Sequence, residues 1–154
     1  DRIAILEAGQ LRQVSPAREL YERPSNLFAA SFIGEMNMLP VAWDGQAARL
    51  QDGSIMPLSD HSMIEPVSNG PSVLAVRPER LQVTAPDTTG AWKAKIRDVV
   101  YAGAGTLVIA ELGDGTEIRA RLPSNTLGTL SPGETIGLAC PPDAALLYNA
   151  DRAA

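Results

Sequence analysis

The sequence holds very few of the residues that build disulfides, metal sites and base-stacking surfaces. Among its 154 residues there is one cysteine, Cys140, and one histidine, His61, and aromatic residues make up 5%. A single cysteine excludes an intrachain disulfide, so we expect a reducing, cytoplasmic compartment. His61 has no second histidine with which to form a metal site, and we expect it on an exposed loop.

Positive charge is also scarce. The chain has 13 Lys and Arg against 18 Asp and Glu, a net charge of -5. A nucleic-acid-binding protein needs a basic face that displaces counterions from phosphates, and often aromatic side chains on which bases stack. The alternation of Lys93, Lys95 and Arg97 is the local exception, which we interpret as the solvated face of a strand. We predict no nucleic-acid partner.

Long hydrophobic runs are missing too. No run approaches the ~20 apolar residues that cross a bilayer, and no leader-like segment opens the sequence, so we predict no direct membrane insertion. Hydrophobic residues nevertheless make up 45% of the chain and charged residues 20%. This composition is typical of a globular protein with a buried core.

The first part of the chain has the pattern of a hairpin followed by a helix. The apolar runs RIAIL and LRQV flank EAGQ, in which Gly9 permits a positive φ. Ser15-Pro16 is a helix start, because the serine side chain accepts a bond from a free amide and proline suits the first turn. We expect this helix to end at Arg23-Pro24.

A second helix is predicted over LFAASFI. Ser25 or Asn26 would cap it, and Gly34 would end it in a left-handed conformation. We predict that its apolar stripe consists of Leu27, Phe28, Ser31 and Phe32.

From Val41 onward, short apolar runs alternate with glycine, proline and aspartate turns. This pattern favours a mainly β fold, a closed or partly closed small barrel preceded by a short α/β segment. The runs predicted as strands are AARL, SIMPL, SVLAVR, RLQVTA, AWKAKIRDVVYA, GTLVIAEL, TEIRARL, ETIGLA and ALLY.

We therefore divide the chain into residues 1–34, residues 35–150 and a tail, residues 151–154. A segment of 34 residues is too small to hold a core alone. We expect it to dock on the barrel, to pair with another copy, or to fray.

The first part also resembles a known family. The matching residues are Asp1-Arg2-Ile3, Gly9, Gln13, Ser15-Pro16, Glu19-Leu20-Tyr21, Pro24, Phe28, Phe32, Ile33-Gly34 and Asn37. In this spacing they resemble the end of the nucleotide-binding domain in the ATP-binding subunits of ABC importers. Ser15 and Ala17 depart from that pattern, in which glycine-threonine and a second acid are common.

The likeness continues into the predicted barrel. LAVRPERLQV, VVYAGAGTLVIAELGDGTEIRARLPSN and LSPGETIGLACPPDAALLY are similar to the OB-like transport-associated (TOBE) domain of such subunits. The chain most resembles polyamine importers, ahead of iron, sugar and glycerol-phosphate importers.

This resemblance implies a non-catalytic piece of a larger ATPase. The sequence has no G-x-x-x-x-G-K-(S/T) loop to hold nucleotide phosphates. By resemblance, the catalytic motifs, ATP and Mg²⁺ belong to the parent protein, and this chain needs no cofactor. The implied partners are a second copy, two permease subunits and a solute-binding protein, at the inner face of the cell membrane.

Two groups of residues are candidates for a ligand or regulatory site. One is Arg77, Pro78 and Glu79; the alternative is that Pro78 fixes a turn while its neighbours satisfy the local backbone or each other. The other is the pair Gly103 and Gly105, whose amides could meet an oxyanion. Since Val108 stands where a dinucleotide motif has its third glycine, a tight turn is the alternative.

Two functions follow from different classes. A regulatory and assembly domain would present an apolar strip to its twin, from the alternate residues of SVLAVR or GTLVIAEL. A sensor of a small molecule or an oxyanion would bind a ligand in the barrel loops or between two barrels.

Overall fold

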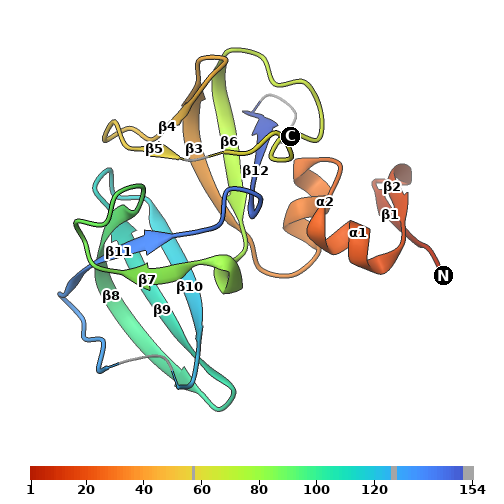
Figure 1. Cartoon of the computed structure of the whole chain (residues 1–154). Helices are drawn as coiled ribbons and strands as arrows, with labels where there is room; N and C mark the ends of the chain where they lie inside the picture. Colours follow the sequence, from red (N-terminus) through yellow and green to blue (C-terminus); the bar gives the residue numbers. More distant parts are fainter. Residues whose placement is uncertain (57, 126–127, 151–154) are drawn as a thin grey trace.

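A computed structural model describes residues 1–56, 58–125 and 128–150. Within these residues the chain is mainly β, with a hairpin and two short helices at one side of an OB-like barrel (Figure 1). The predicted fold class is confirmed. The tail predicted at residues 151–154 lies outside the described residues.

The hairpin forms where the sequence predicts it. Strand β1 spans Ile3–Glu7 and β2 spans Gln10–Ser15, in antiparallel register. Ala8 and Gly9 connect them with φ of 47° and 79°. Two consecutive positive φ values are typical of the turn that matches the right-handed twist of a hairpin.

Two short helices follow, and one predicted cap is wrong. Helix α1 spans Ala17–Glu22 and has no side-chain cap, because Pro16 holds the N-cap position. The buried Ser15 hydroxyl lies one residue earlier and accepts a bond from Gln13. Helix α2 spans Leu27–Phe32. Asn26 caps it as predicted, accepting a 2.9 Å bond from the amide of Ala29.

The buried face of α2 differs from the predicted stripe. Leu27, Ala29 and Ala30 are buried, whereas Phe32 is 63% exposed. The helix packs in two directions: Leu27 and Ala30 contact the barrel, and Ala29 joins a cluster with Ile5 and Leu20. Small alanines allow this double approach. Helical periodicity thus identified Leu27 correctly, but it missed Ala29 and Ala30 and wrongly included Phe32.

One five-stranded sheet of the described barrel has the order β12-β6-β3-β4-β5. These strands span Ala145–Asn149, Gly70–Val76, Asn37–Trp43, Ala48–Arg49 and Ile55–Met56. Strand β3 is not predicted from the sequence, because Pro40 interrupts its apolar run. In the structure Pro40 lies at an exposed position of an alternating strand.

The other described sheet, also of five strands, has the order β10-β9-β8-β11-β7. These strands span Glu117–Pro123, Gly105–Leu112, Trp92–Ala102, Thr135–Ala139 and Gln82–Thr84. A 3-10 helix, η1, spans Pro78–Arg80 between β6 and β7. Every predicted run thus overlaps a strand in the described part of the chain.

The core lies between the inner faces of the two sheets. Leu39, Leu74 and Leu147 from one sheet pack in one cluster with Val108 and Ile118 from the other. Each is 0% exposed. Burying a side chain of this size contributes about 1.5–3 kcal/mol, so this cluster is the main source of the barrel's stability.

Candidate functional site

Arg77 directly follows the core strand β6 and contacts the segment that contains α1 and α2, which we call the helical segment. The residue before a proline is held in the extended region, and Arg77 has φ -74° and ψ 141° ahead of Pro78. Its side chain is only 5% exposed. Pro78 begins η1 and fixes a turn, as one of the two interpretations predicted. The rest of that interpretation is wrong, because the side chains of Arg77 and Glu79 bond to distant residues and not to the local backbone or to each other.

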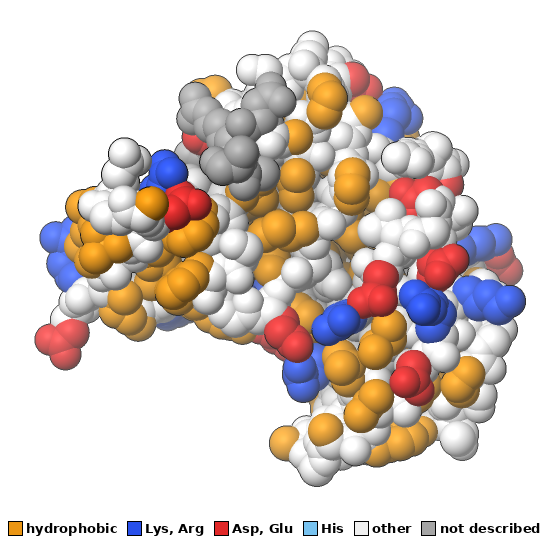
Figure 2. Space-filling view, turned by 180° about the vertical axis from the view of Figure 1, so that it is seen from behind, with side chains coloured by type: hydrophobic (Ala, Val, Ile, Leu, Met, Phe, Trp, Pro, Cys, Tyr) orange, Lys and Arg blue, Asp and Glu red, His pale blue; other side chains and the backbone are white. Residues whose placement is uncertain are grey.

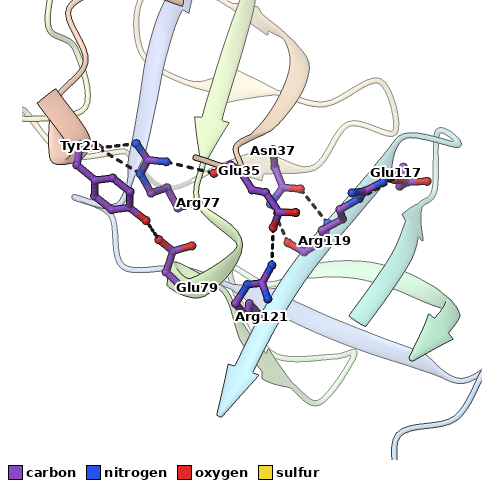
Figure 3. Close-up of polar contacts among 8 residues, drawn as sticks. All are labelled: Tyr21, Glu35, Asn37, Arg77, Glu79, Glu117, Arg119 and Arg121. Atoms are coloured by element: carbon purple, nitrogen blue, oxygen red, sulfur yellow. Dashed lines mark hydrogen bonds and ion pairs between the residues drawn. The ribbon is translucent and has the colours of Figure 1, made fainter. Parts of the chain in front are cut away.

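The guanidinium of Arg77 binds backbone carbonyls of the helical segment. Nε and Nη2 donate to the carbonyl of Tyr21, at 3.2 and 2.7 Å. Nη1 donates to the carbonyl of Ile33 at 2.8 Å. It also donates to the carbonyl of Glu35 at 3.2 Å, and Figure 3 shows Arg77 with Tyr21 and Glu35. The carbonyls near a helix end lack partners within the helix and carry its negative dipole end, which makes them suitable acceptors for a buried cation.

Tyr21 closes this arrangement from the side of α1. The guanidinium carbon of Arg77 lies 3.6 Å from the centre of the Tyr21 ring, a cation–π contact. The Tyr21 hydroxyl donates to the carboxylate of Glu79 (Figure 3). Burial, together with this bond to Glu79, raises the pKa of Tyr21 above its ordinary value.

Two further contacts tie the segment after α2 to strand β10. The carboxylate of Glu35 pairs with Arg121 at 2.6 Å. The Asn37 side chain donates to the carbonyl of Arg119 and accepts from its amide, both at 2.8 Å (Figure 3). We call the contacts made by Tyr21, Glu35, Asn37, Arg77 and Glu79 the junction.

The junction contains residues that sequence reasoning did not place in a site. Tyr21 and Asn37 were noticed only as parts of the family resemblance, and Glu35 not at all. Arg77 lies 56 positions from Tyr21 and 42 from Glu35. No pattern within a few residues predicts a contact between residues so far apart in the sequence. The arginine beside a proline, in contrast, was recognisable as a motif.

A cleft of about 350 Å³ lies between α1 and the barrel, beside the junction. Its described lining comprises Arg18, Tyr21, Glu22, Arg23, Met36, His61, Ala75, Arg77, Glu79, Arg80, Asp143, Ala144 and Leu146. Two of the candidate residues, Arg77 and Glu79, therefore line this cleft, and Pro78 lines a second cavity of about 320 Å³. His61 is exposed as predicted, and it lies at the rim of this cleft.

Gly103 and Gly105 lie elsewhere, at the β8–β9 turn. Gly103 has φ +33°, and a Cβ on Gly105 would stand 2.7 Å from the carbonyl oxygen of Leu122. The predicted tight turn is confirmed. A smaller pocket of about 80 Å³ near this turn is lined by Tyr101, Thr106, Leu122, Ser124, Gly128 and Leu130. Ligand binding at either predicted group stays a prediction.

Other chemistry finds little support in the described residues. They hold no group of three or more His, Cys, Asp or Glu side chains suited to a metal ion. Burial raises the pKa of Cys140 to about 11, which leaves its thiol protonated and unreactive near neutral pH. No helix within the described ranges is long and apolar enough to span a membrane.

Comparison with known proteins agrees with this architecture. The TOBE domain model matches residues 74–147. The spermidine/putrescine import ATP-binding protein PotA 1 of Pseudomonas aeruginosa is 36% identical over 149 residues, which cover 94% of this chain and 40% of that protein. This chain carries the TOBE domain of an ABC importer ATP-binding subunit. A TOBE domain is a non-catalytic part of such subunits.

Another relative of this chain has a different solute in its name. The sn-glycerol-3-phosphate import ATP-binding protein UgpC of Cereibacter sphaeroides is 32% identical over 151 residues, or 96% of this chain and 40% of that protein. The chain thus spans about two fifths of the length of these curated relatives.

A solved structure shows the same fold. It is that of the cytoplasmic molybdate-binding protein ModG with molybdate bound. It matches with a TM-score of 0.56 and covers 75% of this chain and 95% of its own. Since the identity is 15%, the likeness concerns the fold alone.

Proposed function

We propose that this chain is the non-catalytic C-terminal regulatory and assembly part of an ABC importer ATP-binding subunit. The parent protein would couple ATP hydrolysis to solute uptake, and the PotA relatives favour a polyamine such as spermidine or putrescine. ATP and Mg²⁺ would act in the parent, and we expect no ATP hydrolysis by this chain. The parent would sit at the cytoplasmic face of the membrane, with permease subunits and a solute-binding protein as partners.

Within this proposal, residues 1–34 are the end of the nucleotide-binding domain, and residues 35–150 are the TOBE domain. The junction supports the coupling of these parts, because Arg77 binds carbonyls near the ends of both helices. A displacement of the helices would have to break these bonds or carry the barrel with it. Such bonds give the barrel a means of following the nucleotide-binding domain.

The observation that carries the assembly role is the outer face of β8, β9 and β10. Strand alternation buries Val108, Ala110 and Leu112 in the core and turns Leu107 and Ile109 to the opposite face. On β8, Val100 lies opposite Leu107 and is 43% exposed. We call Val100, Leu107 and Ile109 the outer strip. These residues include alternates of GTLVIAEL, one of the two runs from which an apolar strip was predicted.

Charges of both signs border this strip. Arg121 lies opposite Leu107 on β10, Arg119 lies opposite Ile109, and Asp98 lies opposite Ile109 on β8. Figure 2 shows the barrel from behind, with hydrophobic side chains among both kinds of charge. A surface that carries both signs around an apolar centre is complementary to itself under two-fold rotation, which favours a second copy as the partner.

Sedimentation equilibrium tests this function. Val100→Asp places a charge in the outer strip, whereas Ile55→Asp places one at a similarly exposed site, 49% against 43%, on the other sheet. We expect dimers of the unmodified chain, a dissociation constant raised at least tenfold by Val100→Asp, equivalent to about 1.4 kcal/mol, and no change with Ile55→Asp. If the unmodified chain were monomeric, or if the two variants had equal effects on the dissociation constant, the assembly role would be contradicted.

The alternative function is a sensor of a small molecule or an oxyanion. The described lining of the pocket near Gly103 and Gly105 contains no charged side chain, and the pocket is small. The cleft beside the junction is larger and contains several cations, so it is the better place for such a ligand.

A further inference from the structure

The cleft between α1 and the barrel collects positive charge in an acidic protein. Its described lining holds four arginines, Arg18, Arg23, Arg77 and Arg80, and three acids, Glu22, Glu79 and Asp143. With His61 neutral, four minus three gives a local charge of +1, whereas the whole chain carries -5. The arginines come from two sides, since two belong to the α1 region and two to the region of η1.

The acids in this cleft already have partners. Glu22 pairs with Arg18 at 3.0 Å, and Asp143 pairs with Arg80 at 3.7 Å. Glu79 accepts the bond from the Tyr21 hydroxyl. These contacts leave the acids poorly placed to receive a cationic ligand.

Two of the arginines, in contrast, bind only uncharged groups. Arg23 donates to the carbonyl of His61 at 2.9 Å, and Arg77 donates to backbone carbonyls alone. Among the described residues, no carboxylate lies within ion-pair distance of either guanidinium. Arg77 is buried and Arg23 is exposed, and a guanidinium without a counterion gains from a nearby anion.

Tyr148 supports the closeness of these two cations. Its hydroxyl donates to the carbonyl of Pro24 at 2.6 Å, beneath the cleft. Burial raises the pKa of Tyr148, and the charges of Arg23 and Arg77 both oppose that rise. Both guanidiniums therefore act on the same buried ring, where the charge of Glu65 acts in the opposite sense.

We propose that this cleft binds a small polyvalent anion of the phosphate or carboxylate class, with the exposed Arg23 as its principal ligand and the buried charge of Arg77 behind it. Arg18 and Arg80 lie in exposed pairs with Glu22 and Asp143, and each guanidinium has further N–H donors for the ligand while it keeps its pair. The apolar side chains of Met36, Ala75, Ala144 and Leu146 complete the lining. A volume of about 350 Å³ holds a dianion with a short organic part.

Such an anion would bridge α1 and the barrel. Since it binds the docked arrangement, it would shift the equilibrium toward that arrangement in proportion to its affinity. This regulatory consequence rests on the function proposed above, whereas binding itself does not.

Isothermal titration calorimetry on the whole chain tests the proposal, with pyrophosphate, citrate and inorganic phosphate as probes. We expect saturable binding of one anion per chain, with a dissociation constant of about 1 mM or tighter for pyrophosphate or citrate. Arg23→Gln removes one hydrogen bond to an exposed loop and should weaken binding at least tenfold. Arg49→Gln is the matched control, because Arg49, on β4, is also exposed and pairs with Asp44 outside the cleft.

Three results would overturn the proposal. One is the lack of saturable binding to any of these anions. Another is equal weakening by Arg23→Gln and Arg49→Gln, which would indicate attraction to surface charge in general. The third is binding of spermidine in place of anions, lost on Glu79→Gln. Circular dichroism of each variant establishes that it is folded, and sedimentation tests the assembly role separately, so failure of one proposal is distinguishable from failure of the other.

Discussion

The junction and the outer strip are both contact surfaces, but the junction consists of polar, directional bonds and the outer strip of apolar side chains. The junction surrounds a buried cation with directional bonds to three backbone carbonyls. The outer strip consists of half-buried and exposed aliphatic side chains beside exposed ion pairs. Directional bonds to a buried charge fix one geometry within a chain. An apolar surface of this size can be exposed to water when two copies separate, so it suits reversible association.

The largest expected effect compares one arginine from each surface. Arg77→Ala removes a buried cation and leaves three carbonyls without their donor, so we expect a loss of ~3–5 kcal/mol in the free energy of unfolding. Arg119→Ala removes an exposed pair with Glu117 near the outer strip, and we expect a loss of about 1 kcal/mol or less. Urea unfolding followed by circular dichroism measures both.

Arg77→Lys sharpens this comparison. Lysine keeps the charge but lacks the planar fork that reaches the carbonyls of Tyr21 and Ile33 together. Its stability should fall between those of the unmodified chain and Arg77→Ala. Equal stability of Arg77→Ala and Arg119→Ala would show that the junction is no stronger than a surface ion pair.

An intermediate effect is expected at the β8–β9 turn, away from the junction. Gly105→Ala would place a methyl group 2.7 Å from the carbonyl oxygen of Leu122. We expect a loss of ~1–3 kcal/mol from this overpacking. Gly103→Ala meets no atom within 4 Å and costs only its positive φ, about 1 kcal/mol. Thermal unfolding separates the two, and a larger loss at Gly103 would refute the close approach as the cause.

The smallest effect concerns Tyr21 and its bond to Glu79. Tyr21→Phe keeps the ring over Arg77 and removes the hydroxyl, so we expect a loss of about 0.5–1 kcal/mol at pH 7. Because the pKa of Tyr21 is raised in the fold, its contribution is fully present below about pH 10 and declines as pH rises through the folded-state pKa.

The unfolding free energies of the unmodified chain and Tyr21→Phe should therefore converge above about pH 10. Urea unfolding at pH 7, 9 and 10.5 measures this convergence. A constant difference across that range would mean that the hydroxyl of Tyr21 does not hold its proton through the bond to Glu79.

Much of the fold was predictable from local pattern. The turn at Gly9, the cap at Asn26 and the left-handed Gly34 follow from conformational preferences of single residues. The failures occurred where tertiary contact decided the outcome. Ser15 was predicted to cap a helix, but it is buried and accepts a bond from the side chain of Gln13. Phe32 was predicted to be buried, but it is exposed, and Ala29 and Ala30 are buried in its place.

The candidate sites divide in the same way. Arg77, Pro78 and Glu79 were recognisable as a motif, because a charged residue fixed before a proline at a strand end has few local uses. The motif could not reveal that the guanidinium turns away from Glu79 to carbonyls more than forty positions earlier in the chain. Gly103 and Gly105 were also recognisable as a motif, but the larger cleft lies beside the junction and not at their turn.

The sequence by itself determined the mainly β class, the predicted strands and the TOBE-like motifs, because these depend on alternation and turn residues within a few positions. Only the tertiary structure decided that Leu107 and Ile109 face outward while Val108 faces the core, and that the cleft arginines come together. The physical reason is that alternation leaves two equivalent faces, and the packing of one sheet against the other selects between them.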